Sequence, residues 1–346
     1  MADFELPDQL RDETRTAWHR YLDVLSPFRP ELHRFCWRLT GDSWEAEDLV
    51  QDTILRGFGV LGSLHHTIRN PRAYLLRIAT NSWFDTLRRH DLEKSTLPKS
   101  LEEAYTPEDP AEVRGAGALL LQLLAPQERA AFLMKEVFDM SLEEIAHVLG
   151  TTVGAVKAAL HRGRANLRDS ENQPAPRRAP PAAAVVKRFV ELLNASDLKG
   201  LLELMLDTGS VEMLGSLLET GRAEFERKGS WFWHAVHVHP ELPPDKRPPK
   251  FLNETAVFEN EPLVLSFAST EGGRFLAAVT RLEETGGRIV RVRCYQFCPQ
   301  TVSAVGAALG LAVASLPYRF PTPTPGEYWP AETTVSIDSE VRERHK

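Results

Sequence analysis

The stretch 141–168 constrains this chain most, because its local signals define two helices separated by a tight turn. The motif S-x-x-E that begins at Ser141 is a capping box, in which two side chains satisfy free backbone N–H groups of the first turn. Gly150 ends this helix, and Thr151 or Thr152 can cap the next one. Two helices joined by about four residues form a helix-turn-helix, whose second helix can enter the major groove of DNA.

The second of these helices carries a basic side. Four residues recur at i, i+4, i+7 and i+11, which places them on one face at about 100° per residue. They are Lys157, His161, Arg164 and Arg168. A separate apolar stripe consists of Val156, Leu160 and Leu167. A DNA-reading helix and an ordinary helical hairpin with a solvated basic face both fit this pattern.

Bulk properties limit the remaining choices. A length of 346 residues indicates two or three domains, and a net charge of −7 means that any nucleic-acid site must be a local patch. Three cysteines are too few for a disulfide framework and are typical of a reducing cytoplasm. The acidic, polar N-terminus is not a signal peptide, and no apolar run approaches the ~18 residues of a membrane helix. We therefore expect a cytoplasmic protein without a membrane partner.

Two helical stretches precede the helix-turn-helix. After a polar, loosely ordered segment 1–16, residues 18–40 have a helical pattern that breaks near Pro27 and Pro30. Residues 41–58 predict a helix capped by Asp42 or Ser43, and residues 59–70 a loop. The outer side of that helix is acidic, which indicates either a solvated face or a docking surface for a basic partner. Its residues are Glu45, Asp48, Gln51 and Asp52.

A long helix is predicted to begin at Pro71, a residue that suits a first helical position. Trp83 lies on its apolar stripe, so we interpret it as a core residue. Polar residues on the other side are candidates for contact with an opened DNA strand, whose unpaired bases need polar and stacking surfaces. They are Arg77, Asn81, Arg88 and Arg89.

Three motifs in this half resemble the extracytoplasmic-function class of bacterial sigma factors. AEDLVQDTILRGF (46–58) is similar to the helix with which the family binds RNA polymerase. NPRAYLLRIATNSWFDTLRRH (70–90) is similar to the helix that meets the −10 promoter element, and residues 123–167 to the module that reads the −35 element. The resemblance implies core RNA polymerase and promoter DNA as partners, and DNA contact by Thr152 and the basic face of the last helix.

The second half has a different composition. Residues 183–204 predict a helix, a break and a second helix, residues 211–215 a strand, and residues 217–228 a helix. The alternation in 230–239 predicts a strand, and three further strands follow between Pro262 and Phe297. Helices followed by an antiparallel sheet imply an α+β domain. This order resembles the SnoaL-like domains, in which a curved sheet and a helix form a cone with a pocket.

Candidate pocket residues of this domain are aromatic or titratable, although such residues are more often plain core. They are Trp231, Trp233, His237, Tyr295 and Phe297. His237 and His239 point to one side of the predicted strand, but a zinc site needs three or four protein ligands. We therefore expect no metal, no cofactor and no catalytic residue, while a small-molecule ligand in the cone stays open.

The sequence thus predicts a multidomain protein with two all-α DNA-binding domains followed by an α+β SnoaL-like domain. The predicted segments are 18–95, a linker 96–112, 113–170, a Pro-rich linker 171–182, 183–315 and a tail 316–346. We expect a sigma factor, not an enzyme, whose C-terminal domain regulates it in cis. The alternative is a small-molecule enzyme or sensor in the cone, with the DNA-binding half as an accessory.

Overall fold

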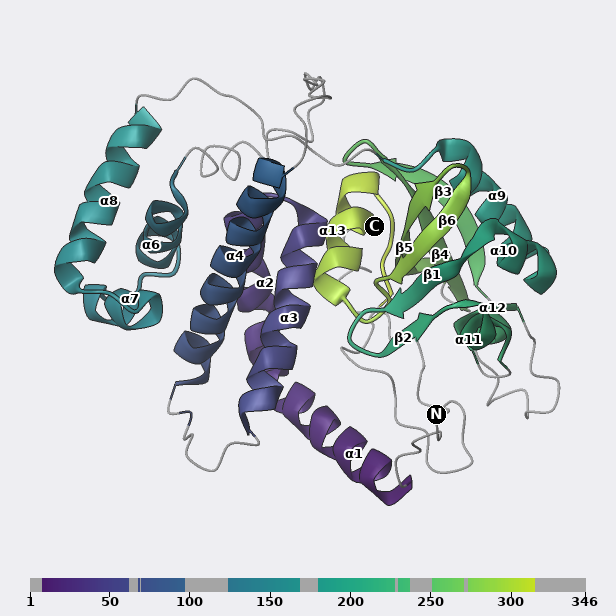
Figure 1. The fold of residues 1–346 in the computed structure, drawn as a ribbon, viewed down its shortest axis with the longest axis horizontal. Helices are drawn as coiled ribbons and strands as arrows, with labels where there is room; N and C mark the ends of the chain where they lie inside the picture. Colours follow the sequence, from purple (N-terminus) through teal and green to yellow (C-terminus); the bar gives the residue numbers. More distant parts are fainter. Residues whose placement is uncertain are drawn as a thin grey trace. The chain divides into compact units, whose positions relative to one another are not determined.

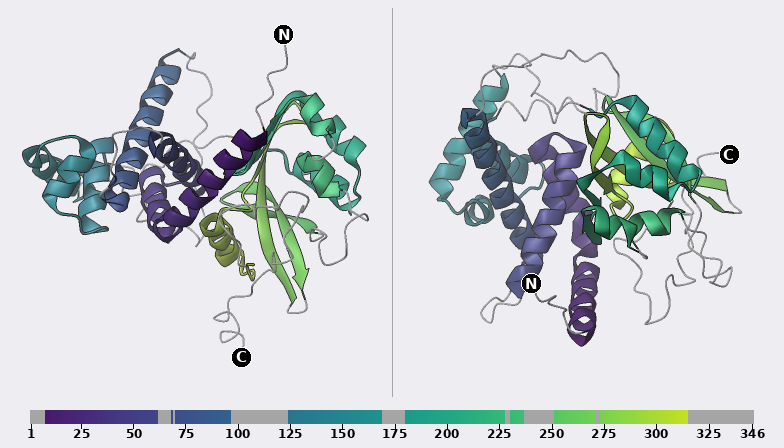
Figure 2. Two further views of the ribbon diagram at one scale, coloured as in Figure 1. Left: turned by 90° about the horizontal axis from the view of Figure 1, so that it is seen from below. Right: turned by 45° about the vertical axis from the view of Figure 1, so that its right-hand side comes forward.

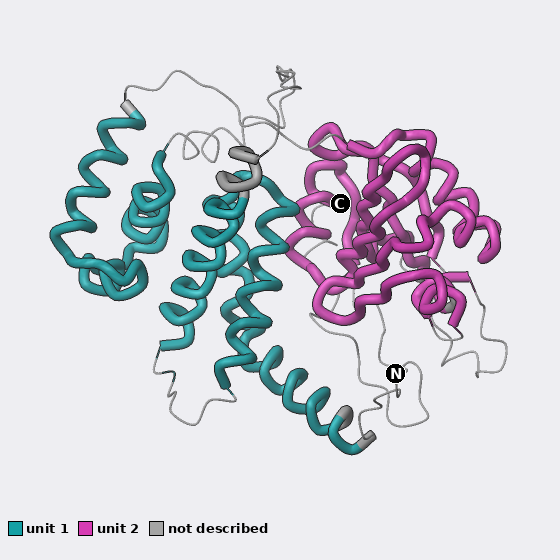
Figure 3. Tube along the Cα trace, viewed as in Figure 1, with its two compact units in different colours: residues 1–177 teal, residues 178–346 magenta. Residues whose placement is uncertain are grey.

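The computed structural model of the chain describes residues 8–61, 68, 70–96, 124–168, 180–227, 230–236, 251–270 and 273–314. The chain divides into two compact units, residues 1–177 and residues 178–346 (Figures 1 and 3). Each unit has a hydrophobic core of its own. The linkers predicted at 96–112 and 171–182 and the predicted tail 316–346 lie largely outside the described residues.

The first unit is entirely helical in its described part. Its elements are α1 (Asp8–Leu25), the 3-10 turn η1 (Ser26–Phe28), α2 (Arg29–Thr40), α3 (Ser43–Leu61), α4 (Pro71–Thr96), α6 (Pro126–Glu136), α7 (Leu142–Leu149) and α8 (Val153–Arg168). The predicted break near Pro27 and Pro30 is confirmed by η1. One core cluster of buried residues runs through both α1–α4 and α6–α8.

Two helix boundaries in this unit correct the sequence prediction. Helix α1 already begins at Asp8, within the segment predicted to be loosely ordered. Its exposed first turns are supported by the i, i+4 hydrogen bond from Gln9 to Glu13, which measures 2.9 Å. Helix α3 continues to Leu61, so the predicted loop begins later than expected. Asp42 is the cap of α3, since its Oδ1 accepts from the N–H groups of Trp44 and Glu45.

The second unit combines helices with one six-stranded sheet. Its helices are α9 (Ala183–Asn194), α10 (Leu198–Leu204), α11 (Arg222–Glu226), α12 (Trp231–Val236) and α13 (Pro299–Leu309). Its strands are β1 (Met205–Met213), β2 (Leu217–Thr220), β3 (Leu252–Phe258), β4 (Glu261–Thr270), β5 (Gly273–Thr285) and β6 (Arg288–Cys294). The strand order is β2-β1-β6-β5-β4-β3, in which only β1 and β6 pair in parallel. The predicted α+β class is confirmed.

The two faces of this sheet are covered differently. Successive residues of a strand point to opposite faces. Along β5, Ala278 belongs to a cluster with Trp231 of α12, whereas Leu276 lies beside Gly306 of α13; a register shift between the two positions turns them to opposite faces. Helices α9–α12 accordingly lie on one face and α13 on the other (Figure 2).

Three local predictions for the second unit were wrong. The run 231–236 forms helix α12, in which Phe232 and Val236 are both buried at the i, i+4 spacing of a helix. Residues 217–220 form the edge strand β2, and only 222–226 are helical. Strand β3 was missed, because most of its side chains are exposed at the sheet edge and give no apolar alternation.

Candidate nucleic-acid interface

Helices α7 and α8 and the turn between them form as the sequence predicts. The Ser141 hydroxyl accepts from the N–H of Glu144, whose carboxylate accepts from the N–H of Ser141, so the capping box is complete. These bonds lower the pKa of Glu144. Gly150 ends α7 with a φ of +62°. Thr152 caps α8, since its hydroxyl accepts from the N–H of Ala155 at 3.2 Å.

The basic side of α8 faces away from the core. Lys157, His161 and Arg164 are exposed, whereas Val156 and Leu160 are buried. The side chain of Arg168 lies outside the described residues. The predicted separation of basic face and apolar stripe is confirmed for the residues that the structure describes.

Two carboxylates on α6 contact side chains of α8, and sequence reasoning missed both. Buried Glu128 accepts from Arg162 Nε at 2.7 Å and from Asn166 Nδ2 at 3.0 Å. Glu136 accepts from Arg164 Nη2 at 2.5 Å. A DNA contact by Arg164 must therefore compete with an existing ion pair. Nothing in the sequence marks these two glutamates, since both lie in an ordinary helical pattern.

The polar side of α4 is also exposed. Arg77, Asn81, Arg88 and Arg89 are all solvent-accessible, as predicted, and Arg88 pairs with Asp85 one turn earlier. Trp83 is only 5% exposed, which confirms its interpretation as a core residue. Asn70 caps the helix through a 3.0 Å bond from the N–H of Ala73.

The acidic side of α3 is less uniform than predicted. Glu45 is exposed, but Asp48, Gln51 and Asp52 are half-buried. The Gln51 amide donates to Glu47 at 2.8 Å, and the Asp52 carboxylate accepts from Arg56 at 2.9 Å. The predicted docking residues thus share one helix, while two of them also serve contacts within the unit.

An exposed ladder of ion pairs connects α3 with α4. Arg56 bridges Asp52 on its own helix and Asp85 of α4, with N–O distances of 2.9 and 3.7 Å. Asp85 also pairs with Arg88. The candidate polymerase contact at Asp52 and the candidate DNA contact at Arg88 are therefore ends of one charged row.

A buried ion pair, which no local sequence pattern predicts, joins α2 and α3. Arg29 Nη2 lies 2.5 Å from the carboxylate of Glu47, whose side chain is fully buried. His33 Nε2 lies 3.7 Å from the other oxygen. Burial lowers the pKa of His33, although the nearby Glu47 acts in the opposite direction. This pair fixes the helix that carries the acidic side.

In the second unit, only part of the candidate pocket is brought together. Trp231 and Phe297 join one apolar cluster with Met213, Ala278 and Cys294. Tyr295 is buried instead beside Arg293, whose guanidinium lies 5.9 Å from its ring. The side chain of Trp233 and the whole of His237 lie outside the described residues.

One buried acid lies at the edge of that cluster. Both carboxylate oxygens of Glu219 accept from the N–H of Trp231, at 3.2 and 3.1 Å. Arg227 Nη2 lies 3.4 Å from Glu219 Oε1. Burial raises the pKa of Glu219. Because its oxygens accept from the first N–H of α12, this carboxylate has a structural role. Its burial is therefore not evidence for a catalytic acid in this domain.

Known proteins match both parts of the first unit. The profile of sigma-70 region 2 matches residues 25–93, and that of sigma-70 region 4 matches residues 118–167. The RNA polymerase sigma-E factor of Streptomyces coelicolor is 33% identical over 147 residues, which are 40% of this chain and 78% of that protein. These matches place the chain in the sigma-70 family. Within it, the chain belongs to the extracytoplasmic-function (ECF) sigma factors.

Other relatives extend the comparison. The ECF RNA polymerase sigma factor SigG of Mycobacterium tuberculosis H37Rv is 31% identical over 226 residues, covering 54% of this chain but only 59% of SigG. The crystal structure of SigJ from M. tuberculosis, another extracytoplasmic-function sigma factor, covers 78% of this chain and 95% of that one, with 20% identity and a TM-score of 0.30. That score is too low to establish a shared arrangement. None of the described helices is long and apolar enough to cross a bilayer.

Proposed function

We propose that this protein binds core RNA polymerase, recognises promoter DNA at the −10 and −35 elements and promotes transcription initiation. Its membership of the ECF sigma factors carries this proposal. The exposed basic side of α8 supports it, because a helix in the major groove needs cations toward phosphates and base edges.

Each surface of the first unit has a distinct role in this proposal. Lys157, His161 and Arg164 of α8 contact the −35 element, together with Thr152 and Arg168. Arg77, Asn81, Arg88 and Arg89 of α4 contact the opened strand of the −10 element. The acidic side of α3, with Glu45, Asp48, Gln51 and Asp52, binds the polymerase.

The second unit is proposed to be a SnoaL-like domain that regulates the first in cis. Its order of two helices, a strand pair, short helices and an antiparallel sheet supports that assignment. The apolar cluster around Trp231 and Phe297 is where a small molecule would bind. Such a ligand changes activity only if it binds the active and inactive arrangements with different affinity.

Run-off transcription with core polymerase on a set of genomic promoters tests the function. We expect specific transcripts from the full chain, and none from core polymerase alone. Cutting the chain after residue 172 tests regulation, since the described first unit has its own core. Equal transcription per mole of folded protein by the full and cut chains would exclude a regulatory role for the second unit.

A further inference from the structure

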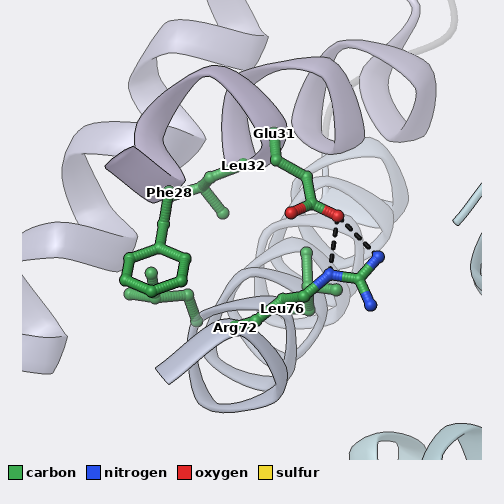
Figure 4. Close-up of a pocket in the computed structure, with 6 residues that line it drawn as sticks. Phe28, Glu31, Leu32, Arg72 and Leu76 are labelled. Atoms are coloured by element: carbon green, nitrogen blue, oxygen red, sulfur yellow. Dashed lines mark hydrogen bonds and ion pairs between the residues drawn. The ribbon is translucent and has the colours of Figure 1, made fainter. Parts of the chain in front are cut away.

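The small pocket between α2 and α4 is lined by side chains that already bind each other. Arg72 Nε donates to Glu31 at 2.7 Å, beside the apolar side chains of Phe28 and Leu76 (Figure 4). The pocket has a volume of about 10 Å³, which is room for at most one water molecule. A partner finds more open groups in the second unit, where the backbone of β3 lies at an edge of the sheet.

The pairing of β3 with β4 shows which backbone groups of β3 face the open edge (Figure 1). Val257 lies opposite Pro262. Proline has no N–H, so this pair is not a hydrogen-bonded one. Bonded and non-bonded pairs alternate along an antiparallel ladder. Asn253, Thr255 and Val257 therefore turn their N–H and C=O groups away from β4, toward the edge.

One of these three residues already has a partner at the edge. Asn194, the last residue of α9, donates from Nδ2 to the carbonyl oxygen of Asn253 at 2.8 Å, and its Oδ1 accepts from the N–H of Asn253 at 3.0 Å. The Asn194 amide thus pairs with Asn253 as the backbone of a neighbouring strand would. Among the described residues, nothing pairs with the edge-facing backbone groups of Thr255 and Val257.

The open part of the edge is short and exposed. It ends at Asn253 on one side and at Glu259 on the other, where a φ of +48° ends the strand. Val257 is 62% exposed, and Thr255 is exposed as well. Natural edge strands are commonly protected by lysine, proline or a bulge. Residues 255–257 carry none of these, so the edge is free to pair with another strand.

A second copy of β3 fits these open groups. When two such strands run antiparallel about a two-fold axis at Ala256, Thr255 of each copy lies opposite Val257 of the other. Both pairs are then hydrogen-bonded, and every open group of the two residues has a partner. An axis at Thr255 or at Val257 leaves half of these groups unpaired, because Asn253 is already bonded and Glu259 lies beyond the strand.

The side chains that this register brings together are compatible. On one face of the sheet Thr255 meets Val257, which is a pair of β-branched residues. On the other face the small Ala256 meets its own copy. Glu254 does not meet its own copy, and its charge is already paired with Arg274 of β5 at 2.5 Å. No like charges therefore lie directly opposite each other.

We propose that β3 is an interaction surface for a second copy of this chain, which joins two second units edge to edge into one continuous sheet. The self-complementary register around Ala256 identifies the partner. A contact through one short strand is smaller than the about 1,000 Å² of a stable interface, so the dimer is weak and depends on concentration. The inference uses only the second unit and is independent of the proposed role in transcription.

Analytical ultracentrifugation of the full chain under reducing conditions tests the dimer. Between about 1 and 200 µM, we expect the mean mass of the wild type to rise from that of a monomer toward about twice that value. Thr255→Pro should stay monomeric, because it removes an edge-facing N–H but none of the bonds to β4. Thr255→Val is the matched control, which keeps the N–H and the branched side chain and should associate like wild type.

Disulfide cross-linking tests the register. At a non-hydrogen-bonded pair the two Cα atoms lie about 4.5 Å apart, a separation that a disulfide can bridge. Ala256→Cys should therefore form a covalent dimer with oxidised glutathione on a non-reducing gel, while the native cysteines are buried. Glu254→Cys is the matched control. Its two copies are offset by roughly 13 Å along the strands, so it should remain a monomer.

Each result decides for or against the β3 contact. A wild-type chain that stays monomeric over the whole concentration range overturns the proposal. Association of Thr255→Pro at wild-type strength shows that the copies meet through another surface. Equal cross-linking of Ala256→Cys and Glu254→Cys rejects the register. Circular dichroism checks the fold of each variant, and if Thr255→Pro is unfolded the cross-linking pair decides. Run-off transcription tests the proposed function separately, so either proposal can fail alone.

Discussion

Two arginines of the first unit are shielded from solvent, and their partners differ. Where α2 meets α3, Arg29 is 4% exposed and faces the fully buried carboxylate of Glu47 at 2.5 Å. Where α2 meets α6, Arg129 is half-buried and faces the carbonyl oxygen of Leu39 and the ring of Trp83. The first junction lies within α1–α4, and the second joins α1–α4 to α6–α8.

The two junctions differ in the free energy that it costs to break their contacts. Removing one partner of a buried ion pair leaves an uncompensated charge away from water, which is strongly destabilising. A guanidinium that faces carbonyl groups and a ring can exchange these contacts for water at a small net cost. Breaking the α2–α3 junction should therefore cost more free energy than breaking the α2–α6 junction.

The largest expected effect is on the α2–α3 junction. Glu47→Ala should lower the free energy of unfolding by about 3–5 kcal/mol, because it leaves Arg29 buried without its carboxylate. Urea denaturation followed by circular dichroism measures this loss. Asp52→Ala is the control, since its ion pair with Arg56 is exposed and should contribute less than about 1 kcal/mol. Equal losses for the two variants would contradict the larger contribution expected of the buried Arg29–Glu47 pair.

A smaller effect is expected at the α2–α6 junction. Arg129→Met keeps an unbranched stem over Trp83 but removes the bond to the Leu39 carbonyl oxygen, so the loss should be about 1 kcal/mol. The same urea titration measures it. A loss as large as that of Glu47→Ala would contradict the expected difference between the two junctions.

The pH dependence of stability sharpens the comparison further. Burial lowers the pKa of His33 in the folded state, with Arg29 acting in the same direction and Glu47 against it. The unfolded chain therefore binds the proton more tightly. The stabilisation is fully present above the unfolded pKa of about 6.5 and is lost as the pH falls through the folded pKa.

We accordingly expect the free energy of unfolding to decrease on acidification from about pH 7.5 to 5.5, with a smaller decrease in His33→Gln. Urea titrations at several pH values measure both slopes. His161→Gln is the control, because His161 is exposed on α8. Greater stability at low pH would instead show that protonated His33 adds to the pairing of Glu47.

Local signals explain what the sequence could predict. The capping box at Ser141, Gly150 and the basic side of α8 each depend on residues within a few positions, so periodicity and caps are enough. Glu45 and Glu47 show the limit of such reasoning. They are the same residue type two positions apart, yet one is exposed and the other fully buried against α2. Only the packing of a distant helix decides which is which.

The same limit applies to whole elements and to the candidate site. Helix α12 was predicted as a strand from the alternation in 230–239, and Phe232 reveals a helix only through its packing on Phe189 and Phe225. The carboxylates of Glu128 and Glu136 meet α8 across more than 25 positions, so no short motif could reveal them. The hydrogen bond from Arg129 of α6 to the carbonyl oxygen of Leu39 in α2 is equally non-local.

An ion pair at the surface should give the smallest effect on stability. Arg164 on the basic side of α8 is 51% exposed and pairs with Glu136, which is 38% exposed, at 2.5 Å. An exposed pair contributes little stability, so Glu136→Gln should change the free energy of unfolding by less than about 1 kcal/mol. Its effect on DNA should be clearer, because the variant removes the group that competes for the guanidinium.

We expect Glu136→Gln to tighten binding of the holoenzyme to duplex DNA with the −35 element by about two- to threefold at low salt, with a smaller gain at high salt. Filter binding over a range of salt concentrations measures it. Glu143→Gln removes an equal charge from an exposed position of α7 and controls for the general change in charge. The gain from Glu136→Gln should also vanish in an Arg164→Ala background. A gain that persists there, or one equal to that of Glu143→Gln, would show that Glu136 acts through its charge at a distance and not by holding Arg164.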